Sequence, residues 1–356
     1  MTKQSLHDSL DGIVKWGDAT TRLDLPIAVA RDEDGNKMSP IELIQPVTAN
    51  DTPEIKAERL ADKAAITITR TGAAIEITTK KSNGHVTVVP NTYTTGKGKN
   101  KVTHYPVTTG SSFTDNREGK VISPIDINVG ELLAHPDLSG LFADGIVVYV
   151  NNVNNRTGTA KNQAVRLLNG TNLPDTGLTF ATPDPMYVKG DYNTTTRSDG
   201  TYSPSMLAAD AITMQSNNWN DSNSTKDISK RIPSETTLNS VLLLGNVPTT
   251  EDLMTYSGGL ENLIRFMEQW TGSGHDYKFK FNGSFICLWD SLVGRGPWGR
   301  SNVYVPPVRE WGYDEMYRKA ANAPPGVPSF CGMEKLGWDW TNLADFADET
   351  LITITE

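Results

Sequence analysis

The sequence has few cysteines, few histidines and no long apolar run, and each shortage excludes a class of protein. Its two cysteines, Cys287 and Cys331, lack C-x-x-C spacing, which excludes a zinc ribbon and a thioredoxin-type motif. One disulfide and two buried thiols both remain open. The five histidines are isolated, and none belongs to an H-E-x-x-H metalloprotease pattern. We therefore expect no metal and no cofactor.

The absence of long apolar runs bears on the membrane and on export. No stretch is long enough to span a bilayer, which takes about 18 or more apolar residues. The opening MTKQSLHDSLDG lacks the apolar segment of a signal peptide. These patterns predict either a cytoplasmic protein or one whose export segment is absent from this chain.

A surplus of positive charge is also missing. The formal net charge is −9, and a nucleic-acid partner would require a basic face, so we expect none. The one basic cluster comprises Lys97, Lys99, Lys101 and His104 in a Gly-Lys-rich stretch. We interpret it as a solvated loop rather than a binding patch.

What the sequence does contain favours β structure. Hydrophobic residues make up 37% and charged residues 21%, and the polar content comes mainly from Thr, Asn, Ser and Gly. Thr is β-branched, while Asn and Gly tolerate the positive φ angles of tight turns. The 30 glycines and 20 prolines are spread along the chain, as expected for many short strands joined by turns.

Residues 1–109 are predicted to form a smaller β-rich N-terminal region. Three alternating segments at 64–71, 73–80 and 85–90 are separated by turn signals, Arg-Thr-Gly and Lys-Ser-Asn-Gly. This pattern predicts an antiparallel meander.

Residues 110–356 have a different hydrophobic pattern. They contain short, mostly apolar runs at 145–151, 164–170, 177–182, 185–193, 210–218, 240–246 and 284–290. Continuous apolar runs are typical of strands buried on both faces. We therefore predict a parallel β-helix-like solenoid. Because the spacing of the runs is irregular, a β-sandwich stays open as the alternative.

One amphipathic helix is predicted over 259–270, since Leu260, Leu263, Ile264, Met267 and Trp270 recur at helical spacing. Such a helix could cover the side or the end of a β coil. The segment from 289 onward is rich in Trp, Pro and Gly, and we expect it to wrap irregularly over the body.

Catalytic motifs are largely missing. No G-x-S-x-G occurs, and the one G-x-G-x-x-G, GRGPWG at 294–299, is not followed by a helix that could bind phosphate. Acidic and basic residues at strand ends are the remaining candidates for polysaccharide chemistry. They are Asp184, Asp191, Asp210, Asp221 and Asp290, with Arg166, Lys189 and Arg295. Corner aspartates commonly bond local backbone N–H groups, so we favour a structural role.

Two further clusters are singled out. Asp115, Arg117 and Glu118 are interpreted as a buried structural network that ties the N-terminal region to the coil. The late aromatic residues Trp298, Tyr304, Trp311 and Tyr313 are candidate carbohydrate-binding residues, with a role as core anchors as the alternative.

A series of segments also resembles a family of bacterial ectodomains found on pilin-like or PilX-like envelope proteins, of the Verrucomicrobia and Planctomycetes type. The segments include DNREGKVISPIDINVGELL, DGIVVYVNN, LAADAITMQSNNW, YSGGLENLIRFMEQWTG, SFICLWDSLVGRGPW and VPPVREWGYDEMY. The resemblance covers roughly residues 110–340 and carries no catalytic residue. It implies a cell-surface or pilus-associated role. Family members usually begin with a pilin-like leader and an apolar helix, whereas this chain begins MTKQ.

The sequence thus favours a non-enzymatic structural or adhesive module of the bacterial envelope, outside the cell, with other envelope subunits or surface glycans as partners. A carbohydrate-active β-helix protein, lyase-like or hydrolase-like, is the alternative. A self-assembling β-solenoid scaffold is a third possibility, but it requires open coil ends, which the 259–270 helix and the Trp-rich tail would close.

Overall fold

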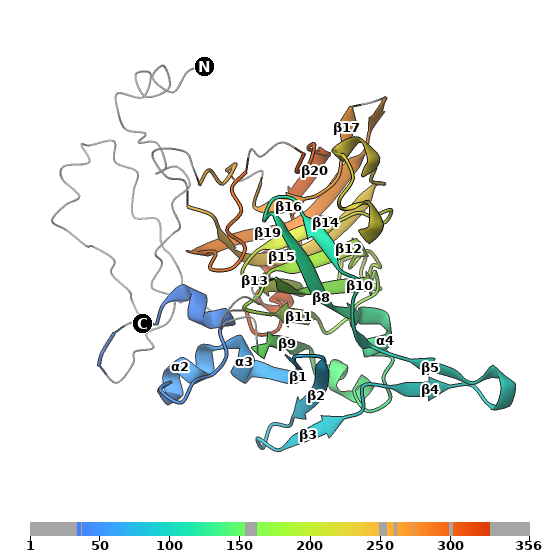
Figure 1. The fold of residues 1–356 in the computed structure, drawn as a ribbon. Helices are drawn as coiled ribbons and strands as arrows, with labels where there is room; N and C mark the ends of the chain where they lie inside the picture. Colours follow the sequence, from blue (N-terminus) through green and yellow to red (C-terminus); the bar gives the residue numbers. More distant parts are fainter. Residues whose placement is uncertain are drawn as a thin grey trace.

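A computed structural model describes residues 34–36, 38–153, 162–248, 255–259, 262–272, 274–298 and 302–327. Its dominant feature is one large, curled, mixed β-sheet with a few short helices at its margins (Figure 1). The prediction of a mainly β fold is therefore confirmed.

Two series of parallel strands make up most of this sheet, and the chain alternates between them. The first series is β1 (Ala64–Thr71), β9 (Ile146–Asn152), β11 (Leu178–Ala181), β13 (Ser205–Ala209), β15 (Thr236–Asn246), β19 (Lys278–Asp290) and β20 (Val308–Tyr313). The second series is β8 (Lys120–Asn128), β10 (Gln163–Gly170), β12 (Met186–Tyr192), β14 (Ile212–Gln215) and β16 (Ile264–Phe266). Each strand pairs in parallel with the next member of its own series. The pair Tyr192–Leu238 joins β12 to β15 and so connects both series into one 16-stranded sheet.

Antiparallel strands flank both series. β2 (Ala74–Lys80) and β3 (Val86–Val89) extend the first series beyond β1, which confirms the predicted meander. β6 (Val107–Thr109) and β7 (Phe113–Asp115) pair with β8 in the second series. Because β1 pairs with β9 and β6 with β8, strands from before and after residue 109 share one sheet.

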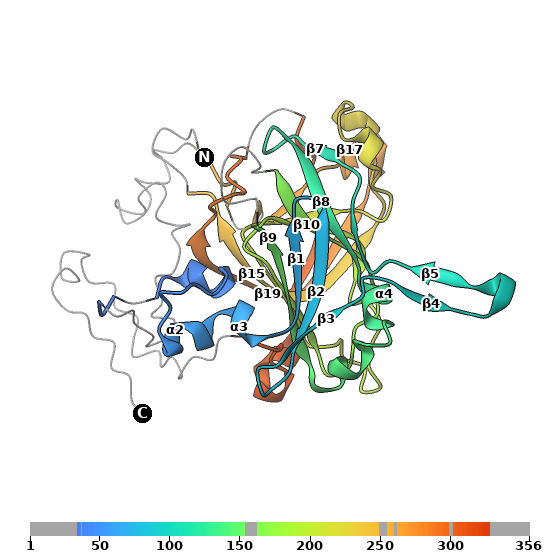
Figure 2. The same ribbon diagram turned by 60° about the horizontal axis from the view of Figure 1, so that its bottom comes forward.

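A hairpin of β4 (Tyr93–Thr95) and β5 (Val102–His104) projects from the body (Figure 2). The 3-10 helix η3 (Gly98–Asn100) lies at its tip, and Lys97, Lys99 and Lys101 are all exposed there.

The described helices are short. The α-helices are α2 (Pro53–Glu58), α3 (Leu60–Lys63) and α4 (Val129–Leu133). The other 3-10 helices are η2 (Pro40–Ile44), η4 (Ser139–Asp144), η6 (Asp221–Asn223), η7 (Ile228–Lys230), η9 (Glu315–Arg318) and η10 (Ala320–Asn322), and a small ribbon pairs β17 (Thr271–Gly272) with β18 (His275–Asp276). Within the described residues, no helix combines the length and the apolar character needed to cross a bilayer.

Most strands in the middle of both series, such as β9, β11, β13 and β14, are buried on both faces, whereas β20 at the end of the first series is largely exposed. One core cluster joins side chains of the first series, such as Val148 and Phe180, with side chains of the second, such as Val165 and Met214. A second cluster packs the opposite face of the first series against η2, α2 and α3. A third cluster, around Tyr187, covers the outer face of the second series. Burial on both sides explains why these strands read as continuous apolar runs.

The predicted helix over 259–270 is wrong. Residues 264–266 form β16, which pairs in parallel with β14. Ile264 and Phe266 point into the main core, while Met267 belongs to the outer cluster. The apolar side chains of this segment pack on two opposite faces, and their spacing along the chain happens to match that of a helix. Leu260, the first residue of the predicted pattern, lies outside the described residues. Gly258 and Gly259, at φ 88° and 74°, lead into the strand.

Candidate functional site

A row of polar side chains crosses the outer face of the second series. The strand register aligns Asp126, Arg166, Tyr187, Thr213 and Arg265 on five neighbouring strands. Aligned residues of parallel strands project from the same face, so this row concentrates charge on a largely buried surface. It is the place where catalytic groups would be expected, if the chain has them.

Within this row, Arg166 forms ion pairs with two carboxylates. Its Nε and Nη2 atoms each lie 2.8 Å from an oxygen of Asp126, and Nη1 lies 2.7 Å from Asp221. Its guanidinium also lies 5.3 Å from the centre of the Phe113 ring. Burial raises the pKa of Asp126, while the adjacent guanidinium opposes that shift. The structure thus brings together two candidates from the sequence, Arg166 and Asp221, in an ion-paired cluster whose carboxylates are both bonded to one arginine.

The predicted network around Asp115 lies further along the same face. Asp115 accepts hydrogen bonds from the Tyr187 hydroxyl at 2.6 Å and from the Arg117 backbone N–H at 2.8 Å. Glu118 forms an ion pair of 2.7 Å with Arg265. Burial, followed by the nearby charge of Arg265, lowers the pKa of Arg117 to about 9. These contacts connect the β7–β8 turn to β12 and β16.

The described part of the glycine-rich segment, residues 294–298, packs against that network. Arg117 donates to the Gly296 carbonyl at 2.8 Å, and Arg265 donates to the Gly294 carbonyl. A Cβ atom on Gly296 would lie 2.4 Å from the Arg117 carbonyl oxygen. Asp210 accepts backbone N–H bonds from 292, 293 and 294. Gly296 therefore allows a close approach of two backbones.

The remaining corner candidates also have local roles. Asp184 accepts from Asn152 Nδ2 at 2.8 Å, and Asp191 accepts from the Thr237 N–H at 2.8 Å. Lys189 is half-buried and acts electrostatically on Asp126, whereas Arg295 is exposed.

Glu268 is a buried acid that the sequence patterns did not reveal. It is 1% exposed, and its two oxygens accept from the N–H and the hydroxyl of Ser216, each at 2.7 Å. Burial raises the pKa of Glu268 to about 7. The only signal in the sequence is a lone acid between Phe266 and Trp270, in a segment that we predicted as a helix.

The late aromatic residues fall into two groups. The Trp298 indole N–H donates to the Tyr304 hydroxyl at 3.0 Å, and the Trp298 ring packs edge-on against Tyr256. Trp311 instead packs on core rings, with the Phe281 and Phe285 centroids 6.2 and 5.6 Å away. Tyr313 is 49% exposed at the end of β20. The four residues therefore do not form one stacking platform.

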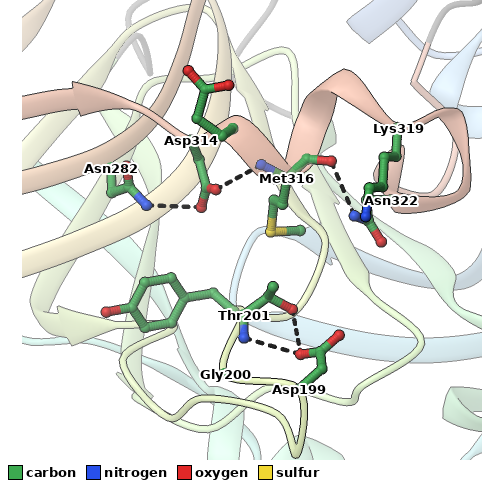
Figure 3. A pocket seen from close by; sticks show the side chains of 10 residues that line it. Asp199, Gly200, Thr201, Asn282, Asp314, Met316, Lys319 and Asn322 are labelled. Atoms are coloured by element: carbon green, nitrogen blue, oxygen red, sulfur yellow. Dashed lines mark hydrogen bonds between the residues drawn. The ribbon is translucent and has the colours of Figure 1, made fainter.

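A surface pocket of about 540 Å³ lies next to the end of β20 (Figure 3). Most of the residues that line it have polar side chains, and one has an aromatic ring: Asp199, Gly200, Thr201, Tyr202, Asn282, Asp314, Glu315, Met316, Lys319 and Asn322. Asp314 holds one wall by accepting from Asn282 Nδ2 at 2.8 Å and from the Met316 N–H at 3.0 Å. Across from it, Thr201 donates to Asp199. Three carboxylates, one ammonium, a hydroxyl and two amide side chains beside a tyrosine offer both hydrogen-bond donors and acceptors, as a hydroxyl-rich ligand such as a sugar requires.

Comparison with protein-family profiles, curated proteins and solved structures gives no match for this chain. Among the residues that the structure describes, no group of three or more His, Cys, Asp or Glu side chains is arranged to hold a metal ion.

Proposed function

We propose that this chain is a non-enzymatic structural or adhesive module displayed on a bacterial surface, and that the pocket of Figure 3 is its contact for a glycan. The resemblance of residues 110–340 to pilin-like and PilX-like ectodomains supports the surface location. So does the Thr-, Asn- and Gly-rich composition.

One observation carries the non-enzymatic half of the proposal. Arg166, the best placed basic candidate, is bound to both nearby carboxylates, Asp126 and Asp221. General acid–base or lyase chemistry needs a group that is free to exchange a proton with a substrate. An arginine held by two carboxylates is instead suited to stabilising the fold.

The finer architecture is part of this proposal. The alternation of the chain between two parallel series is what a β-helix-like solenoid requires, with each passage through both series making one coil. A coil of this kind is a rigid, elongated support for a binding loop. An experimental structure in which β9 did not neighbour β11 would contradict it.

A glycan-array screen and a polysaccharide-depolymerisation assay, run in parallel, test the function. The purified chain is compared with Tyr202→Ala and Lys319→Ala, which alter the pocket. Tyr105→Ala is the matched control, because Tyr105 is 54% exposed, follows β5 of the projecting hairpin and does not line the pocket.

We expect binding without turnover, weakened by both pocket variants and unchanged by the control. Cleavage of any polymer would contradict the proposal and favour the carbohydrate-active alternative, with Asp126 and Asp221 as the acids to mutate first. No binding in either assay would remove the glycan contact and leave only the structural role.

A further inference from the structure

Two strands, β3 and β20, lie at the ends of the first series and its antiparallel extension. Within the described residues, β3 pairs only with β2, and β20 pairs only with β19. Figure 1 places these strands at opposite ends of the sheet. Unpaired edges are ready to accept another strand, and natural proteins usually protect them.

The hydrogen bonds that β20 makes to β19 show which of its residues have backbone groups left to pair with a further strand. The Val308 N–H donates to the Tyr277 carbonyl at 3.1 Å, and the Asp314 N–H donates to the Gly283 carbonyl at 3.1 Å. Alternate residues of a parallel strand bond to opposite neighbours, so Trp311 and Tyr313 turn their backbone groups away from β19.

The same reasoning applies to β3. The Lys81 N–H donates to the His85 carbonyl at 3.0 Å, which makes these two residues a hydrogen-bonded pair. Such pairs alternate along an antiparallel ladder, so Val86 and Val88 turn their backbone groups away from β2. Their side chains are 55% and 63% exposed, unusually high for valine in a strand.

The two edges match in direction and in face. β3 is antiparallel to β2, which is antiparallel to β1, so β3 runs in the same direction as β20. Thr87 lies opposite Thr79, and Thr79 opposite the core residue Ile66. Trp311 likewise lies opposite the core residue Phe281. If Thr87 of a second copy lay opposite Trp311, both core faces would coincide and the outward backbone groups of both strands would meet.

Charge and apolar exposure are complementary as well. Residues 80–89 contain two lysines and no acid, whereas residues 308–315 contain three acids and one arginine. Lys80, Glu310 and Glu315 already form ion pairs within the chain, with Asp62, Lys278 and Arg318, so Lys81 and Asp314 are the charges that differ in sign between the two edges. Val308 and Tyr313 are 38% and 49% exposed, so both edges also present apolar surface. The helix predicted to close a coil end is, in the structure, the strand β16.

We propose that the partner of these edges is a second copy of this chain, with β3 of one copy pairing in parallel with β20 of the next. Such a contact is heterologous, since it joins two different surfaces, and it can repeat from copy to copy into a filament. The proposal stands independently of glycan binding by the pocket.

Sedimentation velocity over a concentration series tests this assembly. Val88→Pro and Tyr313→Pro each remove one outward N–H, and proline is tolerated at such edge positions. Val88→Thr and Tyr313→Thr are the matched controls, because they replace the apolar side chain by a polar β-branched one but keep the N–H. Circular dichroism and thermal melting confirm that each variant is folded.

We expect the wild type to associate with rising concentration, more weakly at high salt, and each proline variant alone to stay monomeric. A mixture of the two proline variants should form a one-to-one dimer and nothing larger, because each retains one opposite edge. A wild type that stays monomeric at every concentration, proline variants that still self-associate, or a mixture that stays monomeric would each overturn the proposal.

Discussion

Arg166 and Asp126 form a two-pronged ion pair, with Nε–Oδ1 and Nη2–Oδ2 distances of 2.8 Å each, on adjacent strands of the second series. Both side chains are almost fully enclosed, with 4% and 11% exposure. A pair in this environment gains little over apolar packing, but breaking it leaves a buried charge without a partner.

Replacement of Arg166 by alanine should therefore lower the free energy of unfolding by about 3–5 kcal/mol, because Asp126 and Asp221 would lose their shared cation. Urea unfolding monitored by tryptophan fluorescence measures the change. Arg197→Ala is the matched control, since Arg197 pairs with Asp199, whose side chain is 52% exposed. The prediction is wrong if both variants lose the same stability.

Glu268 should make stability depend on pH. Its pKa rises from an ordinary 4.5 to about 7 on burial. Below pH 4.5 the folded and unfolded states both hold the proton. Between these values only the folded state holds it, so raising the pH favours unfolding, and above pH 7 the full penalty of about 3 kcal/mol is present.

Glu268→Gln should remove this penalty while keeping an oxygen to accept from the Ser216 N–H. The stability difference between variant and wild type is expected to shift by about 3 kcal/mol in favour of the variant between pH 4.5 and pH 8. Using the difference cancels the contributions of Asp126 and Asp210, whose pKa values burial also raises. A difference that stays constant with pH would contradict the prediction.

Gly296→Ala tests whether the GRGPWG segment is structural. Its Cβ atom would lie 2.4 Å from the Arg117 carbonyl oxygen, so either two backbones must separate or the network must shift. We expect a loss of about 1–3 kcal/mol and a lower melting temperature. Gly140→Ala, which meets nothing within 4 Å, should leave the melting temperature unchanged.

The Cys287 thiol should resist modification in the folded protein. It is a free thiol, and burial, followed by the charge of Asp290, raises its pKa to about 11. Because the thiolate is the reactive form, a Cys331→Ser variant should react with a thiol reagent slowly at pH 8 and fully after denaturation. Rapid reaction of the native variant would show that Cys287 is accessible.

The sequence was informative where the physical signal is local. The alternating segments of the meander and the continuous apolar runs identified strands correctly, since each pattern reflects how many faces of a strand are buried. The 259–270 segment was misassigned because Ile264, Met267 and Trp270 serve two packing faces, and periodicity alone does not separate that case from a helix.

The polar network around Asp115 was likewise predictable only in its local part, and its distant partners were not. Asp115, Arg117 and Glu118 are adjacent in sequence, so their density was visible as a cluster. Their partners were not, because Ser257 and Gly296 lie 140 and 179 positions from Arg117 and become neighbours only through the strand register. The same reason hides the pocket, whose walls come from residues 199–202 and 314–322.

The alternation between two series also shapes how the chain can fold. β9 cannot find β11, nor β10 find β12, until the intervening strand has been placed in the other series. Each added pair of strands extends the two edges on which the next pair forms, so structure should grow in sequence order, slowly and with a loop to close at every step. During synthesis on the ribosome the growing sheet would therefore expose an incomplete edge, and its protection from other nascent chains would depend on how fast the next strands are made.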